Sequence, residues 1–508
     1  MSVLICLALA IPLLTAAGIY FAGKVPNIRE GVTLVGAGAL FLVVIQLALQ
    51  VAAGGTPTVD LLTVVSGDLF QSEPPYIKPG DPERGLKFVF KLEPIGALFA
   101  LVASGLWIVN SLYSIGYMRG NRERNQTRFY ICFAIALFGA MGIAMAGNLF
   151  TLFVFYEVLT LSTYPLVAHK GDEKAQRGAR IYLMTLLGTS IGLFLVGVVW
   201  TYSLAGSLDF VAGGLLTGKV GPLVGSALIL LFAFGIGKAA LMPFHFWLPN
   251  AMVAPTPVSA LLHAVAVVKA GVFTVLKVSV YIFGADTLKE IPATDWVLAV
   301  ACFTIIAASL IAMTKDNLKA RLAFSTVAQL SYVTAGAMLA TQAGFLGGAL
   351  QISAHAVGKM TLFMCAGAIY VATGMTEISQ MRGLGRRMPL VFIAFMIGSL
   401  SIIGIPPLAG GWPKYALMQG ATDIGTTYVA WVLIGSSLLN IAYLLPIPFL
   451  ALMPPEGSPE PAPYKRQGGA PPLAVIPPLI TAGLCFALFF ATGSVADFVT
   501  PALTGGAQ

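Results

Sequence analysis

Apolar segments long enough to cross a lipid bilayer follow one another along almost the whole chain, and this pattern constrains the fold most. About fourteen such segments can be counted, each near the ~20 residues that a membrane helix needs. Only 10% of the 508 residues are charged, and 57% are hydrophobic. The sequence therefore predicts an all-α polytopic membrane protein. The expected spans are 2–22, 30–52, 93–115, 129–147, 149–169, 180–204, 222–247, 254–283, 295–314, 320–340, 344–372, 388–420, 424–452 and 472–496.

Two polar stretches interrupt this series. The longer, 53–92, is rich in Pro, Gly and mixed charge, and we expect an extramembrane loop there that forms a hairpin. The second, 453–470, contains a Pro-rich turn. We expect four parts: N-terminal helices, a first five-helix unit, a second five-helix unit, and a last helix with its tail. Their boundaries are 1–128, 129–283, 295–452 and 471–508.

The distribution of Lys and Arg among the loops predicts the orientation of the chain. Loops that follow odd-numbered spans, such as 116–128, 170–179 and 382–387, carry many more of these residues than loops that follow even-numbered spans. Basic loops stay on the cytoplasmic side of a cell membrane. The sequence therefore predicts a multi-pass protein of the cell (inner) membrane with both termini extracytoplasmic.

Several classes of protein lack support in the sequence. The formal charge of +8 is spread over short loops, so no nucleic acid partner is expected. The five cysteines occur singly, and there is no HExxH, P-loop, GxGxxG after a strand, or GxSxG motif. We therefore expect no cofactor, no metal site and no catalytic residue in this chain. Three intramembrane histidines leave haem ligation open, although their spacing does not favour it.

The stretch 235–271 places ionisable residues inside apolar runs. Lys238 and Lys269 each lie in such a run, and four prolines interrupt the segment between them. A charged residue at the centre of a membrane helix costs roughly 3 kcal/mol or more, so it marks a functional site by default. Proline frees backbone carbonyls, which then need a neighbouring helix or water. Together these features predict a hydrated path for an ion.

Glu157 is the one carboxylate well inside an expected span. A lysine within a few ångströms would stabilise its ionised form. One interpretation is a site that loads protons and is coupled to Lys238, and the other is an ion pair that holds two helices together. Both interpretations predict that Glu157 pairs with a lysine.

Histidines accompany the intramembrane lysines. His355 and Lys359 are four residues apart and so share a helix face, and Lys238 and His245 are seven apart and share one if the helix is regular. Groups that give up a proton as readily as they take one are what stepwise proton transfer needs. The alternative for a single histidine is a contact between helices.

Two further lysines fit this pattern less well. His263 and Lys269 are six residues apart, about a third of a turn from a common face, which weakens the case for a direct pair. Lys277 lies near the end of its expected helix, where we expect its side chain to extend to the membrane surface.

Lys414 follows a second interrupted segment, 402–413, in which prolines and glycines break the twelfth span as prolines break the seventh. Broken helices that recur five spans apart, each with a lysine, are typical of inverted repeats in transporters. The sequence thus predicts two inverted five-helix repeats, formed by spans four to eight and nine to thirteen.

Five motifs occur in an order that resembles a known family. The antiporter-like subunits shared by Mrp-type sodium/proton antiporters, respiratory complex I and membrane-bound hydrogenases carry similar motifs, and the resemblance covers roughly residues 90–450. It implies a fold of fourteen helices with two inverted repeats and proton conduction along a central hydrophilic axis. The motifs are NLFTLFVFYEVLTLSTYPLV, GIGKAALMPFHFWLPNAMVAPTPVSALLHAVAVVKAG, RLAFSTVAQLSYV, HAVGKMTLFMCAGAIY and SIIGIPPLAGGWPK.

The resemblance also assigns roles to residues. Glu157 and Lys238 resemble the glutamate and lysine that gate proton loading, and Lys414 resembles the charged residue near the outlet. Asn250 departs from the pattern, since many relatives have a charged residue there, and the chain ends soon after the last span. The D-type membrane subunit of Mrp antiporters is therefore favoured. The expected proton-transfer residues are Glu157, Lys238, His245, His263, Lys269, His355, Lys359 and Lys414.

Three hypotheses follow for the function. The first is a proton-translocating subunit of a multisubunit cation/proton antiporter, with other membrane subunits as partners and Na⁺ as a second ion. Its variant is a proton-pumping subunit of a complex I-like NADH dehydrogenase or of a membrane-bound hydrogenase. The second hypothesis is a membrane subunit that binds haem or quinone. The third is a scaffold whose buried charges only fix the packing of its helices.

Overall fold

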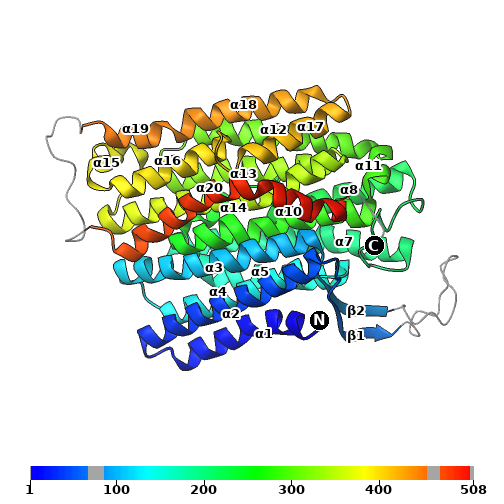
Figure 1. Cartoon of the computed structure of the whole chain (residues 1–508), viewed down its shortest axis with the longest axis horizontal. Coiled ribbons are helices and arrows are strands. Elements are labelled where there is room, and N and C mark those ends of the chain that lie inside the picture. Colours follow the sequence, from blue (N-terminus) through cyan, green and yellow to red (C-terminus); the bar gives the residue numbers. More distant parts are fainter. Residues whose placement is uncertain (1, 67–84, 455–468, 504–508) are drawn as a thin grey trace.

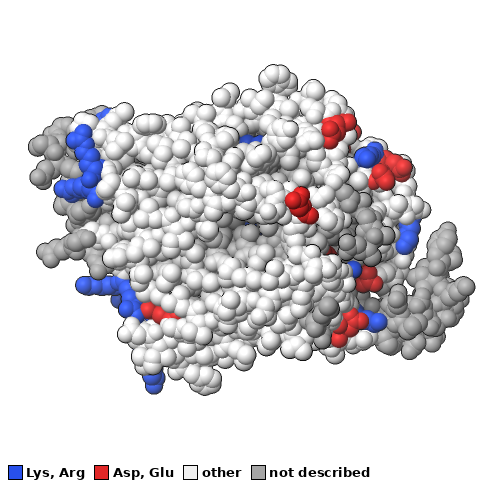
Figure 2. Space-filling model, in the orientation of Figure 1, with Lys and Arg blue, Asp and Glu red and all other residues white. Residues whose placement is uncertain are grey.

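The computed structural model describes residues 2–66, 85–454 and 469–503. The helices lie side by side along the long axis of the molecule (Figure 1). Figure 2 shows the long sides of this face almost free of charged residues, with mainly Lys and Arg at one end and residues of both signs at the other. This arrangement matches a bundle whose sides face lipid and whose two ends face water.

Each of the fourteen expected spans contains a helix, and further short helices lie between some of the spans. In the first part these are α1 (Ser2–Phe21), α2 (Pro26–Ala52), α3 (Pro94–Gly120), α4 (Gln126–Ala144), α5 (Leu149–Val167), α6 (Glu173–Thr189), η2 (Ser190–Phe194), α7 (Leu195–Ala205) and α8 (Pro222–Gly235). In the middle they are η3 (Gly237–Ala239), α9 (Trp247–Asn250), η4 (Ala251–Val253), η5 (Val258–Ala266), α10 (Val267–Val278), η6 (Ser279–Phe283), α11 (Ala285–Glu290), α12 (Pro292–Met313) and α13 (Leu318–Met338). The last are α14 (Gln342–Thr373), η7 (Ile378–Met381), α15 (Leu384–Arg387), α16 (Pro389–Ile403), α17 (Gly411–Asp423), α18 (Thr427–Leu444), α19 (Pro446–Leu452) and α20 (Pro472–Leu503).

Eleven helices of the described part are long and apolar enough to cross a membrane. The three other expected spans differ for physical reasons. The seventh and twelfth are interrupted, so their helices α8 and α16 are short. The tenth, α13, has 21 residues but carries many Ser, Thr and Gln side chains, which are buried against its neighbours.

The hairpin expected between 53 and 92 is present in the described part of that loop. β1 (Thr58–Ser66) pairs antiparallel with β2 (Gly85–Lys91), with Thr58 opposite Lys91. Residues 67–84 lie outside the described residues, as do 455–468 of the second polar stretch. The strands project from the end of the bundle where α1 begins and α20 ends (Figure 1).

Both expected helix breaks are confirmed. α8 ends at Gly235, and the chain continues through η3 and a cis Met242–Pro243 peptide bond to α9. α16 ends at Ile403, and a turn with a cis Pro406–Pro407 bond leads to α17. The inverted relation of the units 129–283 and 295–452 stays a prediction.

Two continuous segments occupy the centre of the bundle. Every residue from Val258 to Phe283 is buried, and so is nearly all of α14. The first segment begins and ends in π-helical turns, η5 and η6, which occur often at functional sites. Charged side chains on these two segments are therefore enclosed by protein rather than lipid.

Candidate functional site

Lys238 lies in the first helix break and is fully buried. Its Nζ donates hydrogen bonds to the carbonyl oxygen of Tyr156, at 2.9 Å, and to Oγ1 of Thr160, at 2.5 Å. The same amino group lies 3.1 Å from the centroid of the Tyr156 ring. A carbonyl, a hydroxyl and an aromatic face all stabilise a positive charge away from water. Helix α5 thus supplies the environment of this lysine.

A glycine allows the central helix to approach this break. A Cβ atom on Gly271 of α10 would lie 2.3 Å from the carbonyl carbon of Lys238. Only a residue without a side chain permits that separation. The break therefore rests directly on the central segment.

Glu157 follows Tyr156 on α5, and both of its carboxylate oxygens are buried without a hydrogen-bond partner among the described residues. The ion pairs found there, within 4.0 Å, do not include Glu157 with Lys238. The expected direct pair is therefore not formed, because Lys238 is directed to the Tyr156 carbonyl and the Thr160 hydroxyl. A buried carboxyl group with no partner needs a proton or a water molecule.

His245 is separated from these contacts. The helix α8 ends at Gly235, before Lys238, so the spacing of seven residues does not place the two side chains on one helix face. The condition for a shared face, a regular helix, is therefore not met. His245 is only partly buried, and its Nδ1 lies 3.2 Å from the carbonyl oxygen of Pro243.

His263 is fully buried in the π-helical segment η5. Neither ring nitrogen has a hydrogen-bond partner in the described part of the chain. Its ring lies 6.2 Å, centroid to centroid, from those of Tyr182 and Trp247. The Tyr182 hydroxyl is hydrogen-bonded to Thr163 of α5, one turn after Thr160. His263 therefore has two ring nitrogens without a partner near Tyr182 and Thr163, which follow Lys238 and Thr160 in a row of polar groups that begins at the first break.

Lys269 and His355 meet between the two central segments. Lys269 Nζ, on α10, lies 2.5 Å from Nδ1 of His355, on α14, and both side chains are buried. The other imidazole nitrogen, Nε2, has no partner among the residues described. The sequence suggested His355 with Lys359 and did not indicate this pair, because the two residues are 86 positions apart. The amine and the imidazole nitrogen are thus within hydrogen-bonding distance of each other.

Lys359 lies one turn after His355 on α14, within the second unit. Its Nζ donates to Oγ of Ser325, at 2.5 Å, and that hydroxyl lies 2.7 Å from the hydroxyl of Tyr443. Tyr443 is in turn hydrogen-bonded to Asn440. Sequence reasoning missed Ser325, Tyr443 and Asn440, because such residues are common in membrane helices as contacts between them. Their positions on α13 and α18 link Lys359 to the helices beside the second break.

Lys414 lies just after the second break and is 6% exposed. Its Nζ donates to the carbonyl oxygens of Ile402, at 3.1 Å, and Ile403, at 2.6 Å, and to Oγ of Ser437, at 2.8 Å. The two carbonyls are at the C-terminal end of α16, where the helix dipole favours a cation. Like Lys238, Lys414 is held by backbone carbonyls near an interrupted helix.

Lys277 does not extend to the membrane surface, so that expectation was wrong. The side chain is fully buried, and its Nζ lies 2.9 Å from Oε1 of Glu93 and 2.6 Å from the carbonyl oxygen of Ala146. The helical segment continues past Lys277 to Phe283, which encloses it. Glu93 was missed because it stands at the edge of an expected span.

A cavity of about 520 Å³ lies at the opposite end from the hairpin and is lined by Thr256, Lys319 and Tyr370 among others. Lys319 Nζ donates to the carbonyl oxygen of Ala254, at 2.6 Å, shortly before η5. Nearby, His169 follows α5, and burial together with the charge of Arg128 lowers its pKa to about 4. The cavity wall at Ala254 and Thr256 lies just before the segment that carries His263.

Comparison with known proteins decides the family. Residues 146–440 match the family model "NADH:quinone oxidoreductase/Mrp antiporter, TM". The chain belongs to this family. It is similar to the N subunit of NADH-quinone oxidoreductase from Desulforudis audaxviator, with 30% identity over 456 residues, 87% of this chain and 88% of that protein. It is also similar to the D subunit of the Na⁺/H⁺ antiporter from Alkalihalophilus pseudofirmus, with 28% identity over 406 residues, 79% of this chain and 81% of the relative.

A solved structure shows the same fold. The Mrp complex from Dietzia sp. contains a chain that superimposes with a TM-score of 0.82 at 22% identity, covering 99% of this chain and 98% of that one. Several other curated relatives are longer, and the chain spans about half their length. The expected fold of a polytopic, antiporter-like membrane subunit is thus confirmed.

Proposed function

We propose that the chain is the proton-translocating membrane subunit of a multisubunit cation/proton antiporter, of the Mrp D type, with other membrane subunits as partners. The observation that carries this proposal is the contact between Lys269 and His355 at the centre of the bundle. On either side of it lie buried lysines held at the two helix breaks, Lys238 and Lys414. The D subunit of the A. pseudofirmus antiporter is a relative that matches over most of both chains.

In this proposal protons enter from Glu157 and Lys238 and move through His263 to the Lys269–His355 pair. Lys269 passes a proton to His355 Nδ1, and His355 releases one from Nε2, which has no other partner in the described part. The arrival of a second charge on Lys359, four residues from His355, favours that release by repulsion. Lys359 and Lys414 complete the path. His245 is left out, since the structure sets it apart from these contacts.

The test uses everted membrane vesicles that contain the intact complex, with proton movement followed by a pH-sensitive dye after addition of Na⁺ or K⁺. Lys238→Met and Glu157→Gln should each abolish most transport, since loss of a positioned proton-transfer group costs about 100-fold. Lys289→Met is the control, because Lys289 is half exposed on α11. Normal transport in both buried-site variants would refute the proposal. Full transport in variants in which the charges of two paired residues are exchanged would refute it too, because that is the result expected of a scaffold.

A second candidate is a proton-pumping subunit of a redox-driven complex. The match to the N subunit of NADH-quinone oxidoreductase, over 87% of this chain, favours it. Purification from native membranes in mild detergent separates the two candidates. Small membrane partners without redox groups would support antiport, whereas iron–sulfur, flavin or nickel–iron partners would support a redox-driven pump.

We further propose that both termini are extracytoplasmic. The end of the bundle opposite the hairpin carries mainly Lys and Arg in Figure 2, and basic residues remain in the cytoplasm. A reporter enzyme that is active only outside the cytoplasm, fused after residue 508, should be active. Activity of a cytoplasmic reporter in the same position would reverse the orientation.

A further inference from the structure

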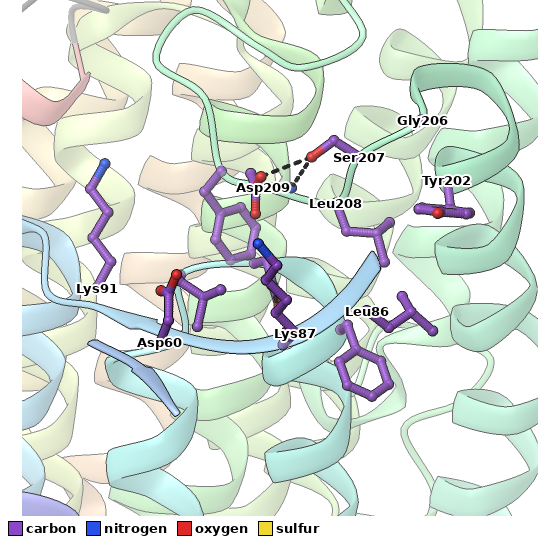
Figure 3. A pocket seen from close by; sticks show the side chains of 14 residues that line it. Asp60, Leu86, Lys87, Lys91, Tyr202, Gly206, Ser207, Leu208 and Asp209 are labelled. Carbon is purple, nitrogen blue, oxygen red and sulfur yellow. Dashed lines mark hydrogen bonds between the residues drawn. The ribbon is translucent and has the colours of Figure 1, made fainter. Parts of the chain in front are cut away.

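A second polar cavity lies at the end of the bundle where the hairpin projects. Its volume is about 260 Å³, and strand β2, the turn between α4 and α5, and the segment after α7 form its walls (Figure 3). Asp60, Lys87, Lys91 and Asp209 surround the opening, and Ser207 donates to Oδ2 of Asp209 at 2.9 Å. We call this cavity the vestibule. Its size and polar walls allow it to hold several water molecules, each of which occupies about 30 Å³ in the liquid.

The ion pair between Glu93 and Lys277 lies directly behind one wall of the vestibule. Phe210 lines the vestibule, and the centroid of its ring is 4.4 Å from Lys277 Nζ. Gly147 also lines it and is adjacent to Ala146, whose carbonyl accepts a hydrogen bond from Lys277. One layer of residues thus separates the water-accessible space from the buried charges.

A buried ion pair such as this one is weak evidence for a stabilising role. Desolvation of two charges offsets most of their attraction, and apolar replacements of such pairs are often neutral or stabilising. Ionisable groups inside a membrane protein are instead typical of ion pathways. The groups that face the pair are Lys91 and the Tyr281 hydroxyl, and both act on it electrostatically.

We propose that Glu93 and Lys277 form a proton-exchange site that opens to the vestibule past Phe210, on the face that holds both termini. The proposal rests on the proposed function above. The Lys277 ammonium transfers a proton to the Glu93 carboxylate, which leaves a neutral amine and a carboxylic acid. The acid then releases its proton to water in the vestibule. The amine takes the next proton from the relay on the same helical segment, where Lys269 lies eight residues earlier, about 12 Å along the axis.

The first experiment tests access. In a functional background without the native cysteines, Phe210→Cys and Phe90→Cys are treated from the extracytoplasmic side with a charged, membrane-impermeant thiol reagent. Phe90 is the control, since it is buried on β2 and does not line the vestibule. Phe210→Cys should react much faster, and its modification should inhibit transport. Equal rates for the two cysteines would overturn the proposal.

The second experiment tests the pair itself. Glu93→Gln, Lys277→Met and the double variant are compared in vesicles with equal amounts of assembled complex. We expect each to lose most of its transport, including the double variant, which leaves no unpaired buried charge. Wild-type transport in the double variant would show a structural pair and overturn the inference.

Lys238→Met in the same vesicles separates the two proposals. If Lys238→Met abolishes transport and the double variant does not, only the exchange site is refuted. If Lys238→Met retains transport, the proposed function itself fails.

Discussion

The amino group of Lys269 lies 2.5 Å from Nδ1 of His355, and the two residues belong to the two most deeply enclosed segments of the bundle. A cation and a titratable ring at that distance compete for the same proton. In the proposed proton path, this pair joins the unit 129–283 to the unit 295–452.

Replacing His355 by Gln should reduce transport by about 100-fold, since the amide cannot take up and release a proton. The measurement is the initial rate of proton movement in vesicles that contain the intact complex. His245→Gln serves as the matched control and should stay near the wild-type rate, because His245 is partly exposed and apart from the path. If His245→Gln transported protons more slowly than His355→Gln, the proposed path would be contradicted.

Lys414→Met should destabilise the protein by about 1–3 kcal/mol, because it leaves two buried carbonyls at the end of α16 without a donor. Ser437→Ala removes only one contact of the same lysine and should cost less. Thermal unfolding of the detergent-solubilised protein compares the two. Equal stability of Lys414→Met and the wild type would show that another group satisfies these carbonyls.

Gly271→Ala should destabilise the protein by about 1–3 kcal/mol and slow transport, since the added methyl group meets backbone atoms of the first break. Gly188→Ala is the control, because a Cβ there meets nothing within 4 Å, and it should be neutral or slightly stabilising. Unfolding temperature and transport rate are measured for both. The prediction fails if the two variants behave alike.

A lower pH should destabilise the folded protein through protonation of His169 in the unfolded chain. Its pKa is lowered from 6.5 to about 4 in the folded state by burial and by Arg128, so the unfolded chain binds a proton first as the pH falls. The contribution of His169 to stability is therefore lost as the pH falls from about 6.5 to 4, and it does not change further below pH 4. This pKa shift corresponds to at most ~3 kcal/mol in the free energy of unfolding.

His169→Gln should remove this part of the pH dependence, as measured by unfolding temperature between pH 7.5 and pH 4.5. The mutation should leave the stability at pH 7.5 almost unchanged. An identical pH profile for the variant and the wild type would exclude His169 as the source.

Much of the fold could be predicted from the sequence, because membrane helices are recognisable by their length and hydrophobicity. The prolines after Lys238 and before Lys414 also predicted both helix breaks, since proline cannot continue the hydrogen-bond ladder. What sequence could not supply was the direction of side chains across helices. The Lys269–His355 contact depends on packing between α10 and α14, and no local spacing encodes it.

The same limit applies to His245 and Lys277. His245 appeared to share a face with Lys238 only while a regular helix was assumed, and the chain leaves that geometry after Gly235. Lys277 appeared to reach the surface because its distance from the helix end was counted along the sequence. In three dimensions Glu93 and Ala146 close over it.

The interrupted helix and its lysine depend on each other. A continuous helix would use the carbonyls of Ile402 and Ile403 internally, and the Lys414 amino group would then have no acceptor there in a region without water. Without the lysine, these two buried carbonyls would have no donor, which would favour a straightened helix. A buried cation introduced by design into another membrane bundle should therefore be accompanied by such an interrupted helix. Either the lysine or the interruption alone would destabilise the host protein, because it would leave buried polar groups without a partner.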